Sequence, residues 1–258
     1  MPLVADLKNG VTEMILQGKK ALITGASRGI GAAIAKKLAA DGADVSITYE
    51  KSAERAAEVI RAIQSYGRKG VAIQADSADV AAVQASVEKT VAELGGLDIL
   101  VNNAGIIRLA DLNDISVEDI DALLHVNVRS PIIASKAALP HLKEGGRIIT
   151  IGSYFADRVP FSMVGVYATT KSALIAFTKG LAREVGPRAI TVNLVQPGPI
   201  DTDMNPSNGP YGSGQVQLTA SGRFGKPEEI ADAVAFLSSW AAQYITGTVL
   251  TVDGGVNA

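Results

Sequence analysis

Short apolar segments alternate with longer amphipathic segments along most of this chain of 258 residues. Several of the short segments are almost continuously apolar and rich in Ile and Val, which is typical of parallel strands covered on both faces of a sheet. The predicted strands are residues 20–24, 44–49, 70–74, 99–102, 146–151, 190–195 and 249–252.

Helical patterns fill the segments between the predicted strands. Ile30, Ile34 and Leu38 recur at every fourth position, and a similar pattern returns within 80–87. Strands that alternate with helices in this way form parallel sheets, because each connection must carry the chain back to the same end of the sheet. The sequence therefore predicts one α/β domain over residues 1–258, built on a doubly wound parallel sheet.

The amino-acid composition limits the kinds of binding partner that we expect. Hydrophobic residues make up 47% of the chain and the formal net charge is −2, so a large core is possible and no electrostatic feature favours nucleic acid or a membrane surface. Cysteine is absent, which excludes disulfides and thiolate metal sites. We find no export signal in residues 1–20 and no apolar run of about 20 residues. We expect a soluble protein in the cytoplasm.

A glycine-rich turn follows the first predicted strand and precedes a helical pattern. Gly25, Gly29 and Gly31 would let the backbone approach the pyrophosphate of a dinucleotide, and the helix N-terminus would present free N–H groups to it. The spacing differs from the common G-x-G-x-x-G pattern, and the alternative is ordinary turn and helix-cap chemistry. The strand before the turn and the helix after it favour nucleotide binding.

The T-G-x-x-x-G-x-G spacing of residues 24–31 resembles that of the short-chain dehydrogenase/reductase family. Further motifs follow in the family's order: N-N-A-G at 102–105, Asn127, Ser153, Y-x-x-x-K at Tyr167 and Lys171, and P-G-x-x-x-T at 197–202. The chain is most similar to bacterial 3-oxoacyl-carrier-protein reductase relatives. The resemblance implies a Rossmann fold, a nicotinamide cofactor, and hydride transfer between that cofactor and a carbonyl or secondary alcohol.

Tyr167 and Lys171 lie four residues apart and would share one face of a helix. A free tyrosine has a pKa of about 10, and a nearby ammonium is expected to lower that pKa. Tyr167 would then serve as general acid in reduction or general base in oxidation. The resemblance adds a substrate hydrogen bond from Ser153, a ribose contact from Lys171, and a water bound by Asn127. A local backbone hydrogen-bonder is the alternative for Asn127.

The two histidines offer a rival chemistry. His125 lies in an apolar helical run and His141 follows a proline near a helix end. Histidine catalysis needs an oriented partner, so we interpret both as structural residues and predict no metal site. Tyr154 lacks a lysine four residues further on, which separates it from Tyr167.

The segment after the second strand bears on cofactor choice. In the alignment implied by the resemblance, Tyr49 takes the place of the aspartate that selects NAD. Arg28 and Lys51 are expected to pair with a 2′-phosphate, and Ser52 to donate a hydrogen bond to it. Glu50 would repel that phosphate if it pointed inward. NADP(H) is therefore favoured, and NAD(H) remains open.

The resemblance implies a wider set of cofactor contacts. The candidate contacts after the third strand could instead form a helix cap, and those after the fourth strand could form a tight turn. Besides Tyr167 and Lys171 and the residues named for cofactor choice, the set is Gly25, Ser27, Gly29, Ile30, Gly31, Asp76, Ser77, Asn103, Ala104, Gly105, Pro197, Gly198, Ile200 and Thr202.

The remaining expectations concern substrate and assembly. Residues 203–222 would form a lid, and Phe155, Met204 and Tyr211 are candidate pocket contacts. The substrate would be a small carbonyl or alcohol, such as a 3-oxoacyl thioester or a related ketone. The C-terminal segment resembles that of homotetrameric relatives. Two readings without catalysis stay open, a nucleotide-responsive regulatory protein that retains the fold and a structural oligomer module.

Overall fold

The seven predicted strands form one parallel sheet in the computed structural model, which describes residues 14–258. The sheet order is β3-β2-β1-β4-β5-β6-β7. Residues 1–13 of the predicted domain lie outside the described residues. Each strand begins and ends within two residues of its prediction: β1 (Lys20–Ile23), β2 (Asp44–Tyr49), β3 (Gly70–Gln74), β4 (Ile99–Asn102), β5 (Arg147–Ile151), β6 (Thr191–Pro197) and β7 (Val249–Val252).

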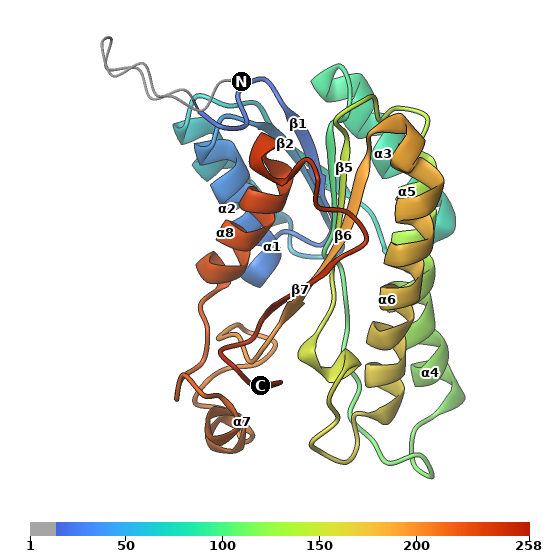
Figure 1. Ribbon diagram of the computed structural model, residues 1–258, viewed down its shortest axis with the longest axis vertical. Helices are drawn as coiled ribbons and strands as arrows, with labels where there is room; N and C mark the ends of the chain where they lie inside the picture. The colour runs from blue at the N-terminus through green and yellow to red at the C-terminus, as the bar shows by residue number, and fades with distance from the viewer. Residues whose placement is uncertain (1–13) are drawn as a thin grey trace.

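Helices cover both faces of the sheet (Figure 1). One face carries α1 (Gly29–Ala40), α2 (Ala53–Ser65) and α8 (Pro227–Ser238), and the other carries α3 (Val80–Leu94), α5 (Ser130–Ala138) and α6 (Gly165–Val185). Successive strand residues point to opposite faces, so Ile23 packs into the core under α1 while Leu22 packs into the core under α6. The predicted fold class, a doubly wound α/β sheet in a single domain, is confirmed.

The strand order reverses beside β1. This strand pairs with β2 on one side and with β4 on the other, and all three run parallel. Connections leaving β1 and β4 therefore diverge to opposite sides and leave a crevice at the carboxyl ends of the two strands, where open α/β sheets bind ligands. The glycine turn follows β1 and the 102–105 motif ends β4, so both border this crevice.

A π-helical turn interrupts the helix that carries Asn127. The helix α4 (Val117–Leu124) runs directly into the π-helical turn His125–Arg129, which continues as α5. The sequence predicted an ordinary helix there. Such turns are single local insertions in α-helices and often occur at functional sites.

The segment 203–222 contains a short helix that the sequence did not predict. This helix, α7 (Gly212–Leu218), follows a turn-rich stretch and lies apart from both helical layers (Figure 1). The described part of the chain also has 3-10 turns at Tyr154–Ala156, Gly186–Arg188 and Trp240–Ala242. Within residues 14–258, no helix combines the length and the apolar character needed to cross a membrane.

Candidate active site

A cavity of about 760 Å³ lies at the carboxyl ends of the strands. Its volume falls within the range of about 300–1,000 Å³ that small-molecule sites occupy. The glycine turn, the ends of β4, β5 and β6, the face of α6 and the 203–222 segment all line it. Segments far apart in the sequence therefore converge on one hollow.

The glycine turn is fixed against the end of β4. The Asn103 side chain donates hydrogen bonds to the carbonyl oxygens of Thr24 (2.8 Å) and Gly25 (3.1 Å). In return, the Thr24 hydroxyl accepts from the backbone N–H groups of Asn103 and Ala104, at 3.0 Å each. This leaves no room for a side chain on Gly25 or Gly31, since a Cβ would lie 2.8 Å from the Ala104 Cα atom or 2.4 Å from the Asn103 amide nitrogen, respectively.

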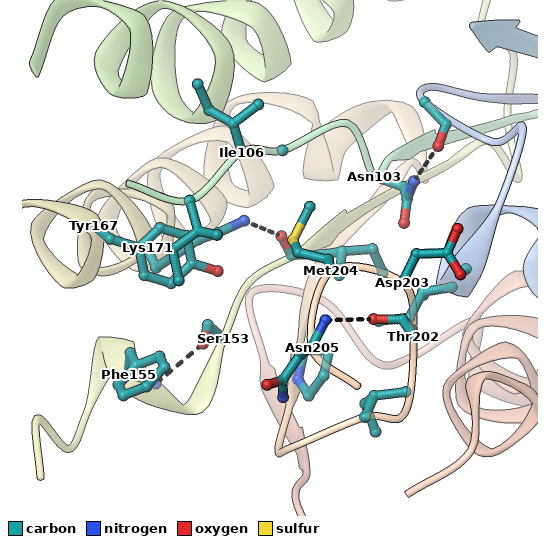
Figure 2. A pocket seen from close by; sticks show the side chains of 18 of the residues that line it. Asn103, Ile106, Ser153, Phe155, Tyr167, Lys171, Thr202, Asp203, Met204 and Asn205 are labelled. Atoms are coloured by element: carbon teal, nitrogen blue, oxygen red, sulfur yellow. Dashed lines mark hydrogen bonds between the residues drawn. The ribbon is translucent and has the colours of Figure 1, made fainter. Parts of the chain in front are cut away.

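The chemistry-bearing side chains meet on one wall of the cavity. Tyr167 and Lys171 project from α6, and Ser153 follows β5 (Figure 2). The Lys171 Nζ atom lies 5.8 Å from the centre of the Tyr167 ring and donates to the Ile151 carbonyl oxygen at 3.1 Å. The Ser153 Oγ atom accepts from the backbone N–H of Phe155 at 3.2 Å, which orients the hydroxyl.

The expected lowering of the Tyr167 pKa is wrong for this arrangement. Burial raises the pKa of Tyr167 to about 12, and a hydrogen bond with Ser153 only partly offsets that rise. Burial also lowers the pKa of Lys171 to about 8. Lys171 directs its ammonium to the Ile151 carbonyl oxygen and contacts the tyrosine over its ring, so desolvation outweighs its influence on the phenol.

Asn127 lies behind the cavity wall with its side chain fully engaged. Its Oδ1 atom accepts from the Ile106 N–H at 2.9 Å, and its Nδ2 atom donates to the Ile106 carbonyl at 2.9 Å and to the Thr170 hydroxyl at 3.1 Å. Gly105 separates Asn127 from Lys171, because a Cβ there would lie 3.4 Å from Asn127 Oδ1 and 3.5 Å from Lys171 Nζ. Asn127 thus fixes the chain beside the lysine.

Nearly all predicted cofactor contacts border the cavity. Tyr49 differs, since its ring packs against the core and its neighbours Glu50, Lys51 and Ser52 reach the cavity instead. The predicted residues that line it are Gly25, Ser27, Arg28, Gly29, Ile30, Gly31, Lys51, Ser52, Asp76, Ser77, Asn103, Ala104, Gly105, Ser153, Tyr167, Lys171, Pro197, Gly198, Ile200 and Thr202.

Both histidines lie away from the cavity lining. The His141 Nε2 atom lies 2.9 Å from a Glu88 carboxylate oxygen, and His125 begins the π-helical turn. Among residues 14–258 there is no group of three or more His, Cys, Asp or Glu side chains placed to hold a metal ion.

The cations predicted to meet a phosphate pair with carboxylates. The Lys51 Nζ atom lies 2.7 Å from Glu50, and the Arg28 Nη1 atom lies 3.5 Å from Asp203. Arg55, which the sequence analysis missed, donates a hydrogen bond to the same Asp203 oxygen. No motif signals Arg55, because it meets Asp203 across 148 positions of sequence.

Large apolar side chains also line the cavity, interspersed with Ser162, Asn205 and Gln215. Phe155, Met204 and Tyr211, the predicted pocket contacts, all line it. Leu109, Phe161 and Met163, which the sequence analysis did not single out, line it as well. Met163 has a backbone φ of 68°, uncommon for a residue with a side chain, and its carbonyl accepts from the Ala110 N–H at 3.1 Å.

The fold, the glycine turn and the cavity wall that carries Tyr167, Lys171 and Ser153 together define a class of protein. A family model described as enoyl-(acyl carrier protein) reductase matches residues 25–257. The chain belongs to the short-chain dehydrogenase/reductase family. This membership confirms the predicted class of activity, an oxidoreductase that works between alcohol and carbonyl groups.

Individual relatives cover nearly the whole chain. A short-chain dehydrogenase from Burkholderia cenocepacia J2315, solved in complex with NADP, is 57% identical with a TM-score of 0.94, over 95% of this chain and 100% of that one. The cyclic-di-GMP-binding biofilm dispersal mediator protein of Escherichia coli K12 is 46% identical over 241 residues, which are 93% of this chain and 98% of that protein. The 3-oxoacyl-(acyl-carrier-protein) reductase FabG of the same organism is 44% identical over 249 residues, 94% and 99% of the two chains.

Proposed function

We propose that this chain is an NADP(H)-dependent reductase of neutral, apolar ketones. The observation that carries the proposal is the convergence of Tyr167, Lys171 and Ser153 on the cavity that the glycine turn also borders. A phenol, an ammonium and a hydroxyl around one hollow supply a proton donor and polar groups for an oxygen that gains negative charge.

The cofactor, when bound, supplies the hydride that reduces the carbonyl carbon. Tyr167 gives its phenolic proton to the carbonyl oxygen, and Ser153 donates a hydrogen bond to that oxygen as charge develops there. With its pKa raised to about 12 by burial, Tyr167 keeps its proton at neutral pH. A protonated phenol is the form that general-acid catalysis of carbonyl reduction requires. Lys171 binds the ribose hydroxyls, and Asn127 positions the chain beside Lys171.

The glycine turn suits a dinucleotide pyrophosphate, since it borders the cavity at the N-terminus of α1, where free backbone N–H groups can bind phosphate oxygens. Arg28, Lys51 and Ser52 border the end where a 2′-phosphate would lie. The Burkholderia relative was solved in complex with NADP, which supports the same choice here. NAD(H) is the alternative, and a direct comparison of the two cofactors with the purified protein tests it.

The substrate end indicates the kind of ketone. Its lining includes Leu109, Phe155, Phe161, Met163, Met204 and Tyr211, with the uncharged polar side chains of Ser162, Asn205 and Gln215 among them. Apart from Lys171, the charged residues that line the cavity belong to the cofactor end or to Asp203 at its border. A neutral ketone with an apolar body, such as a 3-oxoacyl thioester, suits this lining better than a small keto acid.

Three further features belong to the proposal. Residues 203–222 act as a lid over the substrate end. The chain assembles as a homotetramer, supported by the outer edge of β7, which ends the described sheet, and by the exposed Trp240 and Tyr244 nearby. It works in the cytoplasm, which suits a chain without cysteine.

Purified protein tests this proposal when it is offered NADPH or NADH with a panel of apolar ketones, 3-oxoacyl thioesters and keto acids. We expect NADPH oxidation with the apolar ketones, and a loss of at least about a hundredfold in kcat for Tyr167→Phe with cofactor binding retained. Tyr66→Phe, on the exposed end of α2, is the matched control and should behave as wild type. Equal activity in Tyr167→Phe contradicts the mechanism, and a preference for NADH contradicts the cofactor.

A nucleotide-binding regulator is the second candidate. The observation that favours it is the 46% identity to a protein named for binding cyclic-di-GMP. Calorimetry with cyclic-di-GMP and with NADP⁺ separates the two candidates. Binding of cyclic-di-GMP by a protein that turns over none of the panel supports the regulator.

A further inference from the structure

Two arginines from different strand–helix turns share one carboxylate oxygen at the border of the cavity. Arg55 donates to the Asp203 Oδ2 atom through its Nη1, and the Arg28 Nη1 atom lies 3.5 Å from the same oxygen. Figure 2 shows Asp203 directed away from Tyr167 and Lys171. The three side chains are about half exposed, with 51%, 53% and 53% of their surface accessible for Arg55, Arg28 and Asp203, so an incoming anion can reach them.

Both arginines occupy positions where helices disfavour cations. Arg28 caps the N-terminus of α1, and Arg55 is the third residue of α2. The partial positive charge of a helix N-terminus repels a cation and attracts an anion. One aspartate thus serves two guanidinium groups, while Lys36, Glu58 and Glu228 also line the smaller hollow that Arg28, Arg55 and Asp203 share. The Arg55 hydrogen bond and charge hold the pKa of Asp203 below its usual range, so this carboxylate stays ionised.

Arg55 also lies next to a residue already expected to meet the phosphate. Ser52 caps the N-terminus of α2 without a side-chain capping bond, and Arg55 lies three residues further on, on the same helix face. Arg28 and Asp203 line the main cavity, and they also line a smaller hollow of about 370 Å³ together with Arg55. Arg55 therefore lies directly behind the cofactor end of the cavity.

We propose that Arg55 is a specificity-determining residue for the 2′-phosphate of the cofactor, and that Asp203 competes with this phosphate for Arg28 and Arg55. The proposal rests on the NADP(H) dependence proposed above. A phosphate dianion forms charge-assisted bonds with both guanidinium groups and displaces the aspartate. Asp203 begins the lid segment 203–222, so binding of the phosphate releases that end of the lid from the N-terminal half of the domain.

Binding of NADP⁺ and NAD⁺, measured by calorimetry, tests the arginine. Arg55→Gln should weaken NADP⁺ binding about tenfold and leave NAD⁺ binding unchanged, since only NADP⁺ carries the phosphate. Arg61→Gln removes the same charge from an exposed position further along α2 and should match wild type. Equal weakening of both cofactors would show a general structural role and would overturn the assignment.

Replacing the competing aspartate should have the opposite effect on NADP⁺ binding. Asp203→Asn should tighten NADP⁺ binding about two- to fivefold, and this gain should shrink in the Arg55→Gln background because the two residues are coupled. Hydrogen exchange of the lid provides a readout without turnover. Adding 2′,5′-adenosine bisphosphate should speed exchange at 203–211, and 5′-AMP should not. Weaker NADP⁺ binding in Asp203→Asn, or no change in exchange when the bisphosphate is bound, would overturn the competition.

The two proposals fail separately. If wild type binds NADP⁺ no more tightly than NAD⁺, the proposed cofactor is wrong. If wild type prefers NADP⁺ and Arg55→Gln retains that preference, the cofactor stands and only the role of Arg55 is wrong.

Discussion

Burial sets the chemistry of the two central side chains at the residue scale. Lys171 is only 5% exposed and Tyr167 borders the cavity from the same helix, α6. Desolvation disfavours the charged form of each group, which raises the pKa of the phenol and lowers the pKa of the ammonium. At neutral pH the phenol is uncharged in the folded and the unfolded state, so only the buried ammonium of Lys171 costs stability.

Replacing Lys171 with Met should stabilise the fold at neutral pH. The lysine pKa falls from 10.5 to about 8 on folding, so below pH 8 the buried charge destabilises the native state by roughly 3 kcal/mol. Loss of the bond to the Ile151 carbonyl offsets about 1 kcal/mol. We expect Lys171→Met to raise the free energy of unfolding by about 1–3 kcal/mol at pH 7, as measured by urea denaturation.

The size of this gain in stability depends on pH. Between about pH 8 and 10.5 the unfolded chain binds the proton that native Lys171 lacks, so the contribution of Lys171 to wild-type stability rises with pH. The advantage of Lys171→Met should therefore vanish by about pH 10.5. Lys179→Met, at an exposed position of α6, should show neither effect. An advantage that stays constant from pH 7 to 10 would contradict a buried, charged lysine.

At the scale of elements, the turns after β1 and β4 behave as one unit. Asn103 and Thr24 exchange hydrogen bonds across the gap between the two strand ends. Gly25 has a backbone φ of 63°, and a Cβ there would lie 2.8 Å from the Ala104 Cα atom. The close approach of the two backbones explains why glycine is needed in the turn.

Gly31→Ala should disturb this unit. The added Cβ would lie 2.4 Å from Asn103 Nδ2 and 2.8 Å from Ala26 Cα, so backbone must move. We expect the free energy of unfolding to fall by about 1–3 kcal/mol and cofactor binding to weaken. Gly186→Ala is the control, because nothing lies within 4 Å of its Cβ position. A Gly31→Ala variant as stable as wild type would mean that the turn and Asn103 separate easily.

The sequence predicted correctly those features that depend on neighbouring residues in the chain. The seven strands were predictable because runs of Ile and Val need burial on two faces, and the glycine turn because its spacing is contiguous in sequence. The π-helical turn at Asn127 and the helix α7 were not predictable, since neither has a distinct residue pattern. The pKa of Tyr167 was predicted with the wrong sign because spacing shows a neighbouring lysine and hides the degree of burial.

At the scale of the whole molecule, the open end of the sheet has the clearest consequence. β7 pairs only with β6 among the described strands, and its other edge is unpaired there. Large aromatic side chains lie exposed in the segment between α8 and β7, with Trp240 at 53% and Tyr244 at 99%. Free strand edges beside exposed aromatic residues favour association with symmetric copies.

We expect light scattering to give about four times the mass of one chain. Tyr244→Lys places a charge in the proposed interface and should shift the protein to smaller species. Tyr66→Lys changes an exposed tyrosine at the C-cap of α2 and should leave the assembly intact. A monomer in the wild type, or an unaltered tetramer in Tyr244→Lys, would place the interface elsewhere or remove it.

The bonds between Asn103 and the glycine turn bear on the timing of cofactor exchange. Because the protein's own hydrogen bonds join the turns after β1 and β4, the glycine turn has its shape before any nucleotide binds. Capture then requires no slow rearrangement of this wall and can approach the limit set by diffusion. Differences in residence time between cofactors should arise instead at residues 202–205, where side chains of Arg28 and Arg55 hold Asp203 and have to move when a phosphate binds.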